Sequence, residues 1–148
     1  MKSDKASSRK IQWGGLPFHS LSWDLQQRFG KKLYKLSLDG GMSFPNRDGT
    51  LGRGGCIFCS AGGSGDFAAP RQEDLNLQIQ EAKAQIAGKA KDLEPPSYNA
   101  YFQSYTNTYA PLDHLEKLFF AAAAHPDTAV LLNATRPACL GQPGIRWM

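Results

Sequence analysis

Apolar residues recur every three or four positions in three stretches of the chain, which is the period of an amphipathic helix. A short helix is predicted within residues 19–32, with Gly30 as its stop signal. A longer one is predicted from Glu73 to Leu93, where two prolines end it, and a third after Pro111. The positions that carry these patterns are Leu21, Leu25 and Phe29, then Leu75, Ile79, Ala82, Ile86, Ala90 and Leu93, then Leu112, Leu115, Leu118, Phe119 and Ala122.

Three shorter stretches have the character of strands. Residues 34–38 alternate between apolar and polar, Asn99 to Tyr105 is rich in aromatic residues between turn signals, and Thr128 to Ala134 is an apolar run bounded by prolines. The order is strand, loop, helix, strand, helix, strand. This order predicts an α/β fold with right-handed crossovers and parallel strands, either an open doubly wound sheet or part of a barrel.

In both architectures the functional groups gather at the carboxyl ends of the strands. Three segments follow the predicted strands: a glycine-rich loop, "TNTYAP" and "TRPAC". We expect these segments to lie on one edge of the sheet, because parallel strands all end there. The two cysteines of the loop would then meet Thr106, Asn107 and Arg136.

Composition and charge limit the class of protein. The 148 residues are 41% apolar, which suits one domain with one core. The net charge of +4 comes in good part from the opening "MKSDKASSRK", so residues 1–18 are expected to form a flexible basic tail, more often solvated than bound to nucleic acid. No apolar run reaches the roughly 18 residues that span a bilayer. The expected protein is soluble and cytoplasmic, without a membrane.

Three cysteines, two of them in a C-x2-C pair at Cys56 and Cys59, favour metal or redox chemistry over a disulfide scaffold. A closed zinc site needs four ligands, and the three histidines have no matching spacing; His114 is expected to be an exposed helix residue. A thioredoxin-type dithiol would follow its strand directly, at the start of a helix. An iron–sulfur cluster tolerates the long glycine-rich loop found here, because backbone amides can approach its sulfurs.

The stretch "KLSLDGGMSFPNRDGTLGRGGCIFCSAGGSGDFA" resembles the cluster loop of the YhcC-like branch of the radical SAM superfamily, itself similar to the catalytic subunit of Elongator. The likeness continues through "YFQSYTNTYAPLDHLEKL" and "ATRPACL", and so covers roughly residues 19–140. It implies the N-terminal portion of a partial (β/α) TIM-like barrel. In that family, cysteines spaced C-x11-C-x2-C bind a [4Fe-4S] cluster that cleaves S-adenosyl-L-methionine reductively, with electrons from a donor such as flavodoxin or ferredoxin.

By this resemblance, Cys56 and Cys59 match the second and third cluster ligands. Phe58 matches an aromatic residue that lies against the adenine of S-adenosyl-L-methionine, and Arg136 would suit its carboxylate, since a guanidinium binds that group through two bonds. The polar residues at the end of the second strand would face the methionine amino group. These residues are Gln103, Thr106 and Asn107. For Phe58 and Gln103, ordinary packing is an equal alternative.

The chain departs from the family pattern at Phe44, where the first cysteine of the motif belongs. Phenylalanine has no lone pair for iron, and Cys139 is a weak candidate to replace the missing thiolate. Residues 141–148, "GQPGIRWM", are expected to be a truncated or aberrant end. Two hypotheses stay open. One is an impaired radical SAM enzyme, and the basic charge of the chain is compatible with RNA as its substrate. The other is a non-catalytic fragment that binds metal loosely through the C-x2-C pair, or an acidic partner through the tail.

Overall fold

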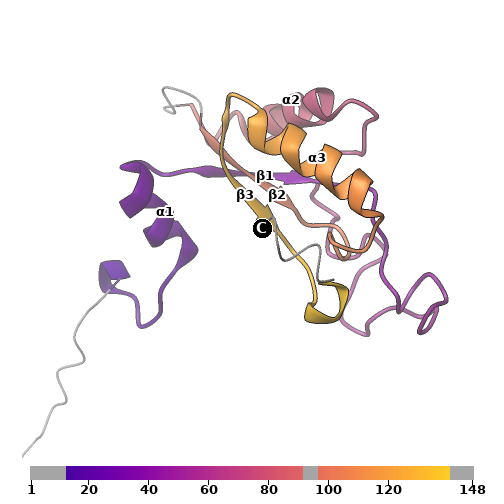
Figure 1. Cartoon of the computed structure of the whole chain (residues 1–148). Helices are drawn as coiled ribbons and strands as arrows, with labels where there is room; N and C mark the ends of the chain where they lie inside the picture. The colour runs from indigo at the N-terminus through magenta and orange to yellow at the C-terminus, as the bar shows by residue number, and fades with distance from the viewer. Residues whose placement is uncertain (1–12, 92–96, 141–148) are drawn as a thin grey trace, which may run out of the picture. The chain divides into compact units, whose positions relative to one another are not determined.

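The computed structural model describes residues 13–91 and 97–140, in two compact units that divide between Leu33 and Tyr34 (Figure 1). The positions of the units relative to each other are not determined. Most of the predicted basic tail and the whole of the predicted aberrant end, residues 141–148, lie outside the described residues.

The first unit contains a short 3-10 helix, η1 (Trp13–Gly15), and the helix α1 (Leu21–Phe29). The hydroxyl of Ser20 caps the amino end of α1 by accepting a hydrogen bond from a backbone N–H of the first turn. Gly30 ends the helix in the left-handed conformation, with φ 67°. The predicted helix and its stop signal are therefore confirmed.

The second unit is a three-stranded sheet with two crossover helices. Its elements in chain order are β1 (Tyr34–Leu38), α2 (Leu75–Ile86), β2 (Tyr98–Phe102), α3 (Leu112–Ala124) and β3 (Thr128–Asn133). The strand order is β1-β2-β3, and both pairings are parallel. The predicted parallel α/β sheet is confirmed. In the described ranges no helix is both long and apolar enough to cross a membrane.

Both crossover helices cover the same face of this sheet, and Figure 1 shows α2 and α3 side by side on it. The core forms because alternate strand residues point to that face, where Phe102 packs its ring 5.2 Å from that of Phe119. The strand residues of the core are Leu36, Leu38, Tyr98, Ala100 and Phe102, and the helix residues are Ile79, Ala82, Leu115, Phe119 and Ala122.

Two elements differ from the prediction by more than one residue at an end. The helix expected over Glu73–Leu93 begins at Leu75 and ends at Ile86, and a turn through Gly88 follows because glycine disfavours continuation of the helix. The second strand ends at Phe102, not at Tyr105, whose φ of 59° is incompatible with a strand. The chain thus turns away from the sheet three residues earlier than its aromatic content suggests.

Candidate functional site

The loop after β1 folds back on itself through its own backbone. The backbone amides of Arg47 and Asp48 donate to the carbonyl of Phe44, at 3.0 and 3.2 Å. The amide of Gly55 donates to the backbone carbonyl of Asn46 at 3.0 Å. Gly55 has φ 72°, a conformation that favours glycine. The segment from Phe44 to Gly55 is therefore a closed loop, which brings the backbone back beside Asn46 just before Cys56.

Cys56 and Cys59 form the ends of a single turn. The amide of Cys59 donates to the carbonyl of Cys56 at 3.0 Å, and both side chains are half-buried. The side-chain amide nitrogen of Asn46 lies 3.9 Å from the Cys56 sulfur, the distance of a weak hydrogen bond to sulfur. Within the described ranges, no third cysteine, histidine or carboxylate joins this pair in a group that could hold a metal ion.

Phe44 is buried, with 5% of its surface exposed, and its ring lies 6.0 Å from that of Tyr105. The guanidinium of Arg47 lies over both rings, 5.6 Å from the centre of Phe44 and 5.5 Å from that of Tyr105. Arg47 also donates hydrogen bonds to the carbonyls of Ser60, at 2.9 Å, and Ala61, directly after Cys59. We call these three side chains, Phe44, Arg47 and Tyr105, the arginine clamp. It fixes the segment that follows the cysteine turn.

The tip of the loop is held by Asp48 and Thr50. The backbone N–H of Thr50 donates to the Asp48 carboxylate at 2.9 Å, and this bond is the main reason that the pKa of Asp48 lies below its usual range. The Thr50 hydroxyl lies 3.1 Å from the hydroxyl of Tyr109, which follows β2. The loop is thereby tied to the second segment at the carboxyl edge of the sheet.

The polar residues after β2 are largely engaged with the protein itself. Gln103 accepts hydrogen bonds from Lys35, at 3.2 Å, and Ser37, at 3.3 Å, and donates to the carbonyl of Ser64 at 2.6 Å. Thr106 is buried, and its amide donates to the carbonyl of Ser43. Gln103 therefore joins β1 and the glycine-rich loop to the end of β2.

Asn107 is fully buried at the ends of two strands. Its side-chain nitrogen donates to the carbonyl of Phe102 at 2.7 Å and to that of Ala134 at 3.0 Å. Its side-chain oxygen has no hydrogen-bond partner among the described residues. Four other buried side-chain oxygens share this property, those of Asn99, Ser104, Thr128 and Asn133. A buried acceptor without a partner is compatible with a ligand that donates a hydrogen bond there.

Arg136 connects the third segment to the cysteine loop. Its guanidinium donates to the side-chain oxygen of Asn46 at 3.3 Å, and the nitrogen of the same amide faces Cys56. The segments after β1 and β3 thus meet through Asn46, and Thr108 joins the segments after β2 and β3 by donating to the carbonyl of Cys139 at 2.8 Å. The structure brings together the three strand-end segments that the sequence places on one edge.

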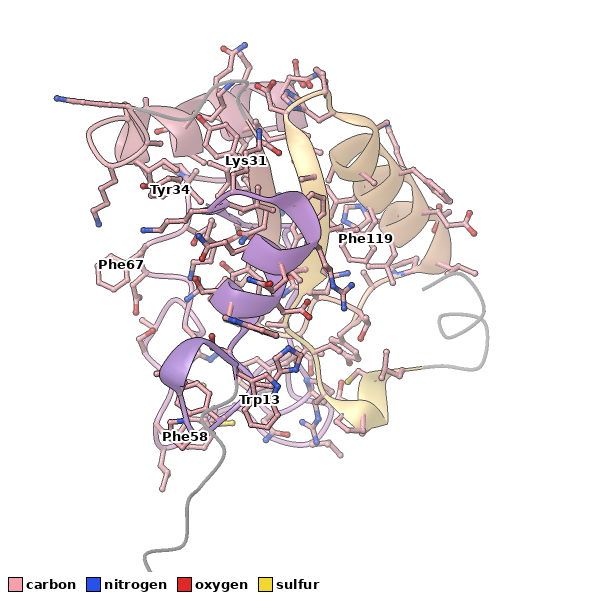
Figure 2. The ribbon with its side chains drawn as sticks, turned by 90° about the vertical axis from the view of Figure 1, so that its left-hand side faces the viewer. Trp13, Lys31, Tyr34, Phe58, Phe67 and Phe119 are labelled. Atoms are coloured by element: carbon pink, nitrogen blue, oxygen red, sulfur yellow. The ribbon has the colours of Figure 1, made fainter. Side chains whose placement is uncertain are left out.

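Phe58 and Cys139 lie differently. Phe58 is 83% exposed, so ordinary packing does not account for it. Phe67, which follows the cysteine turn, is also strongly exposed, and Figure 2 shows it projecting at the left of the view. Cys139 ends a short 3-10 helix, η2 (Pro137–Cys139), and is half-buried. It does not belong to a metal-binding group with the cysteine turn in the described part of the chain.

One prediction about a histidine was wrong. His114 is half-buried, not exposed, because it lies beside the segment that follows β1, with its Nε2 3.1 Å from the carbonyl of Gly40. It lines a cavity of about 320 Å³ with Asp39 and Arg71. Sequence reasoning also missed Asn46, Arg47 and Tyr105. The only signal for the first two was their place inside "FPNRDGT", in the loop that carries the resemblance.

Several curated proteins are similar to this chain. It is 47% identical to the uncharacterized protein YtqA of Bacillus subtilis over 123 residues, and these residues make up 83% of this chain and 37% of that protein. It is 41% identical over 118 residues to protein YhcC of Escherichia coli K12, 79% of this chain and 36% of that protein. The uncharacterized protein MJ0486 of Methanocaldococcus jannaschii is 28% identical over 116 residues, 78% of this chain and 34% of that protein. The chain therefore spans little more than a third of the length of these relatives. No protein-family model and no solved structure matches it.

Proposed function

We propose that this chain is part of a radical SAM iron–sulfur protein of the YhcC-like branch, in which cluster binding is impaired. The observation that carries the proposal is the link from Cys56 through Asn46 to Arg136, which joins the cysteine turn to a cation after β3. The similarity to protein YhcC over 79% of the chain supports the likeness to that protein, and the radical SAM part of the proposal rests on the resemblance of the cysteine loop. A thiol pair beside a guanidinium at the carboxyl edge of a parallel sheet suits a cofactor with both an iron–sulfur and a carboxylate part.

We further propose that the sheet is the first part of a partial (β/α) TIM-like barrel. Its strands are neighbours in chain order, and both crossover helices cover one face. In a doubly wound sheet helices cover both faces, whereas in a barrel they form a single outer layer. The one-sided arrangement of α2 and α3 therefore favours the barrel.

A [4Fe-4S] cluster held by three thiolates does not fit the residues present. Cys56 and Cys59 would provide two ligands, but the place of the third is taken by Phe44, whose ring is buried beneath Arg47. No other cysteine, histidine or carboxylate of the described residues completes the set. We therefore assign no catalytic step to the chain with Phe44 in place.

The residues proposed for S-adenosyl-L-methionine fit better. The exposed ring of Phe58 is free to stack on an adenine, and the Asn107 oxygen is a buried acceptor suited to an amino group. Arg136 carries five N–H donors, of which the bond to Asn46 uses one. The side chain of Gln103 is hydrogen-bonded to Lys35, Ser37 and Ser64, so we propose that it positions the site. We propose that Thr106 adds a polar side chain to the lining of the site.

The missing third ligand favours a second candidate function. A non-catalytic chain could use the C-x2-C pair to bind a soft metal ion loosely, since two thiolates alone form an incomplete zinc site. For the whole radical SAM protein, we propose an electron donor such as flavodoxin or ferredoxin. We propose the cytoplasm as its location. RNA as substrate rests only on the basic charge and the distant likeness to Elongator.

Anaerobic reconstitution with iron and sulfide tests the proposal on three chains: the natural sequence, Phe44→Cys and Phe44→Ala. Phe44→Cys should bind several-fold more iron and sulfide and gain the absorbance of a [4Fe-4S] cluster, because it restores the third thiolate. Phe44→Ala is the matched control, since it opens the same space without a ligand. Equal iron in all three would contradict the proposal, and zinc uptake by all three would favour the loose metal site. Cleavage of S-adenosyl-L-methionine is then measured for Phe44→Cys.

A further inference from the structure

We infer that Cys56 and Cys59 form a reversible dithiol–disulfide pair in the metal-free chain. The hydrogen bond from the Cys59 amide to the Cys56 carbonyl closes a four-residue turn. Such a turn holds its first and fourth Cα atoms within about 7 Å of each other. A disulfide needs a Cα separation of roughly 4.4–6.8 Å, so the two sulfurs can be joined with little movement of the backbone.

The two thiols are free for this chemistry. Neither cysteine is in a disulfide, both are half-buried, and the one hydrogen bond to either sulfur in the described part of the chain is the weak one from Asn46. Phe44 cannot supply the thiolate that would commit the pair to a cluster. The two residues between them, Ile57 and Phe58, are strongly exposed. The turn is therefore at the surface, where a small oxidant can reach the sulfurs.

The turn is fixed on both sides without a metal. On the amino side, the amide of Gly55 donates to the carbonyl of Asn46 at 3.0 Å. On the carboxyl side, Arg47 donates to the carbonyls of Ser60 and Ala61, and the Tyr105 hydroxyl donates to the carbonyl of Ala61 at 3.0 Å. Because both flanks are held, the reduced pair stays in the geometry of the turn, and closure within the chain is favoured over adducts with external thiols.

The reaction balances with a small-molecule disulfide such as oxidised glutathione as oxidant. The thiolate of one cysteine attacks the oxidant, forms a mixed disulfide and releases one glutathione thiol. The thiolate of the other cysteine then attacks the protein sulfur of that mixed disulfide, closes the Cys56–Cys59 bond and releases the second glutathione. Two electrons pass from the protein thiols to the oxidant, and the two protons remain on the released glutathione. Excess reduced glutathione reverses both steps.

The test uses the full chain with metal removed by a chelator, equilibrated in glutathione buffers of graded oxidation. Free thiols are then alkylated, and the sites are mapped by mass spectrometry. The expected result is a single transition in which two of the three thiols disappear, the mass falls by two hydrogens, and the mapped bond joins Cys56 to Cys59. Cys139 stays alkylated throughout. Cys139→Ser should keep the transition, whereas Cys56→Ser and Cys59→Ser should each carry one glutathione on the remaining cysteine of the pair.

Glutathione adducts on both Cys56 and Cys59 of the natural chain, or a bond from either to Cys139, would overturn the inference. The mapping of the natural chain decides this without relying on the folding of any variant. The inference concerns the same loop as the proposed function but does not require it. If the natural chain forms the disulfide but Phe44→Cys binds no iron, the inference stands and the proposed function is rejected. If Phe44→Cys binds iron but the natural chain forms no disulfide, the proposed function stands and the inference is rejected.

Discussion

Replacing Arg47 with glutamine is expected to open the loop that holds the cysteines. The substitution removes the guanidinium from the rings of Phe44 and Tyr105 and deprives the carbonyls of Ser60 and Ala61 of a charged donor. These interactions join the start of the loop to the segment that follows Cys59. Without them, the segment is held by its own turns and by three hydrogen bonds from the end of β2: from the Tyr105 hydroxyl to Ala61, from the Tyr105 amide to Gly63 and from Gln103 to Ser64.

The size of the effect follows from the interactions that glutamine cannot make. A hydrogen bond to a charged group contributes about 1.5–3 kcal/mol, and a cation–π contact at an exposed site about 0.5–1 kcal/mol. Arg47 is half-buried, and glutamine can replace one of its two hydrogen bonds, so the upper part of this range does not apply. A loss of about 2 kcal/mol remains. Since 1.4 kcal/mol is a factor of ten, the equilibrium between closed and open loop should shift by about 30-fold.

Amide hydrogen exchange over residues 60–65 measures this shift, because local opening sets the exchange rate of amides such as that of Gly63, which donates to the carbonyl of Ser60. Arg47→Gln should speed their exchange by about 30-fold. Arg53→Gln is the matched control, since it removes the same charge from an exposed position of the same loop. The amides of β1 and β2 should keep their rates in both variants.

A change of less than about threefold in Arg47→Gln would refute the arginine clamp, since it corresponds to well under 1 kcal/mol. An equal acceleration in Arg53→Gln would also refute it, because the effect would then come from the net charge of the loop and not from the contacts of one side chain. Faster exchange throughout the sheet would show that Arg47 supports the whole unit.

Two further predictions concern the edge of the sheet and the loop tip. Asn107→Ala removes the two side-chain hydrogen bonds to the carbonyls of Phe102 and Ala134, although each carbonyl keeps a backbone N–H donor. At about 1 kcal/mol for each bond lost, the free energy of unfolding in urea should fall by about 2 kcal/mol, with Thr108→Val as a less buried comparison. The lowered pKa of Asp48 means that its carboxylate stabilises the tip above the usual carboxyl range and that this contribution is lost as the pH falls through the lowered pKa. The Thr50 amide resonance should move over that acidic range in the natural chain but not in Asp48→Asn.

Periodicity was sufficient to predict the framework of the sheet, because each element repeats one physical rule over many residues. The alternation in β1 and the apolar stripe of α3 are set by burial of one face, and this burial is what the structure shows. The helix α2 was predicted too long because Ala90 continues the spacing of its apolar stripe. Gly88 was visible in the sequence, and its cost within a helix outweighs that spacing.

The contacts of the loop could not be predicted in the same way. A glycine-rich sequence shows that the backbone can turn closely, but it does not show which side chain will fill the space inside. Arg47 meets Tyr105 only because β2 ends at Phe102 and the chain then turns into the left-handed region. The partners of Gln103 are likewise set by the register of β1 and β2, so its predicted role toward a methionine amino group stays a prediction.

Phe44 has two opposing effects on the chemistry of the loop, and they explain why a single substitution there is informative. Its ring supports Arg47, so it stabilises the loop without metal, yet it takes the place of a cluster ligand. Phe44→Cys therefore removes part of the arginine clamp while it adds a thiolate. Metal and oxidant then compete for the same sulfurs, because a thiolate bound to iron cannot attack a disulfide. In the metal-free variant the loop should be looser than in the natural chain, and iron should restore the order that the ring had supplied.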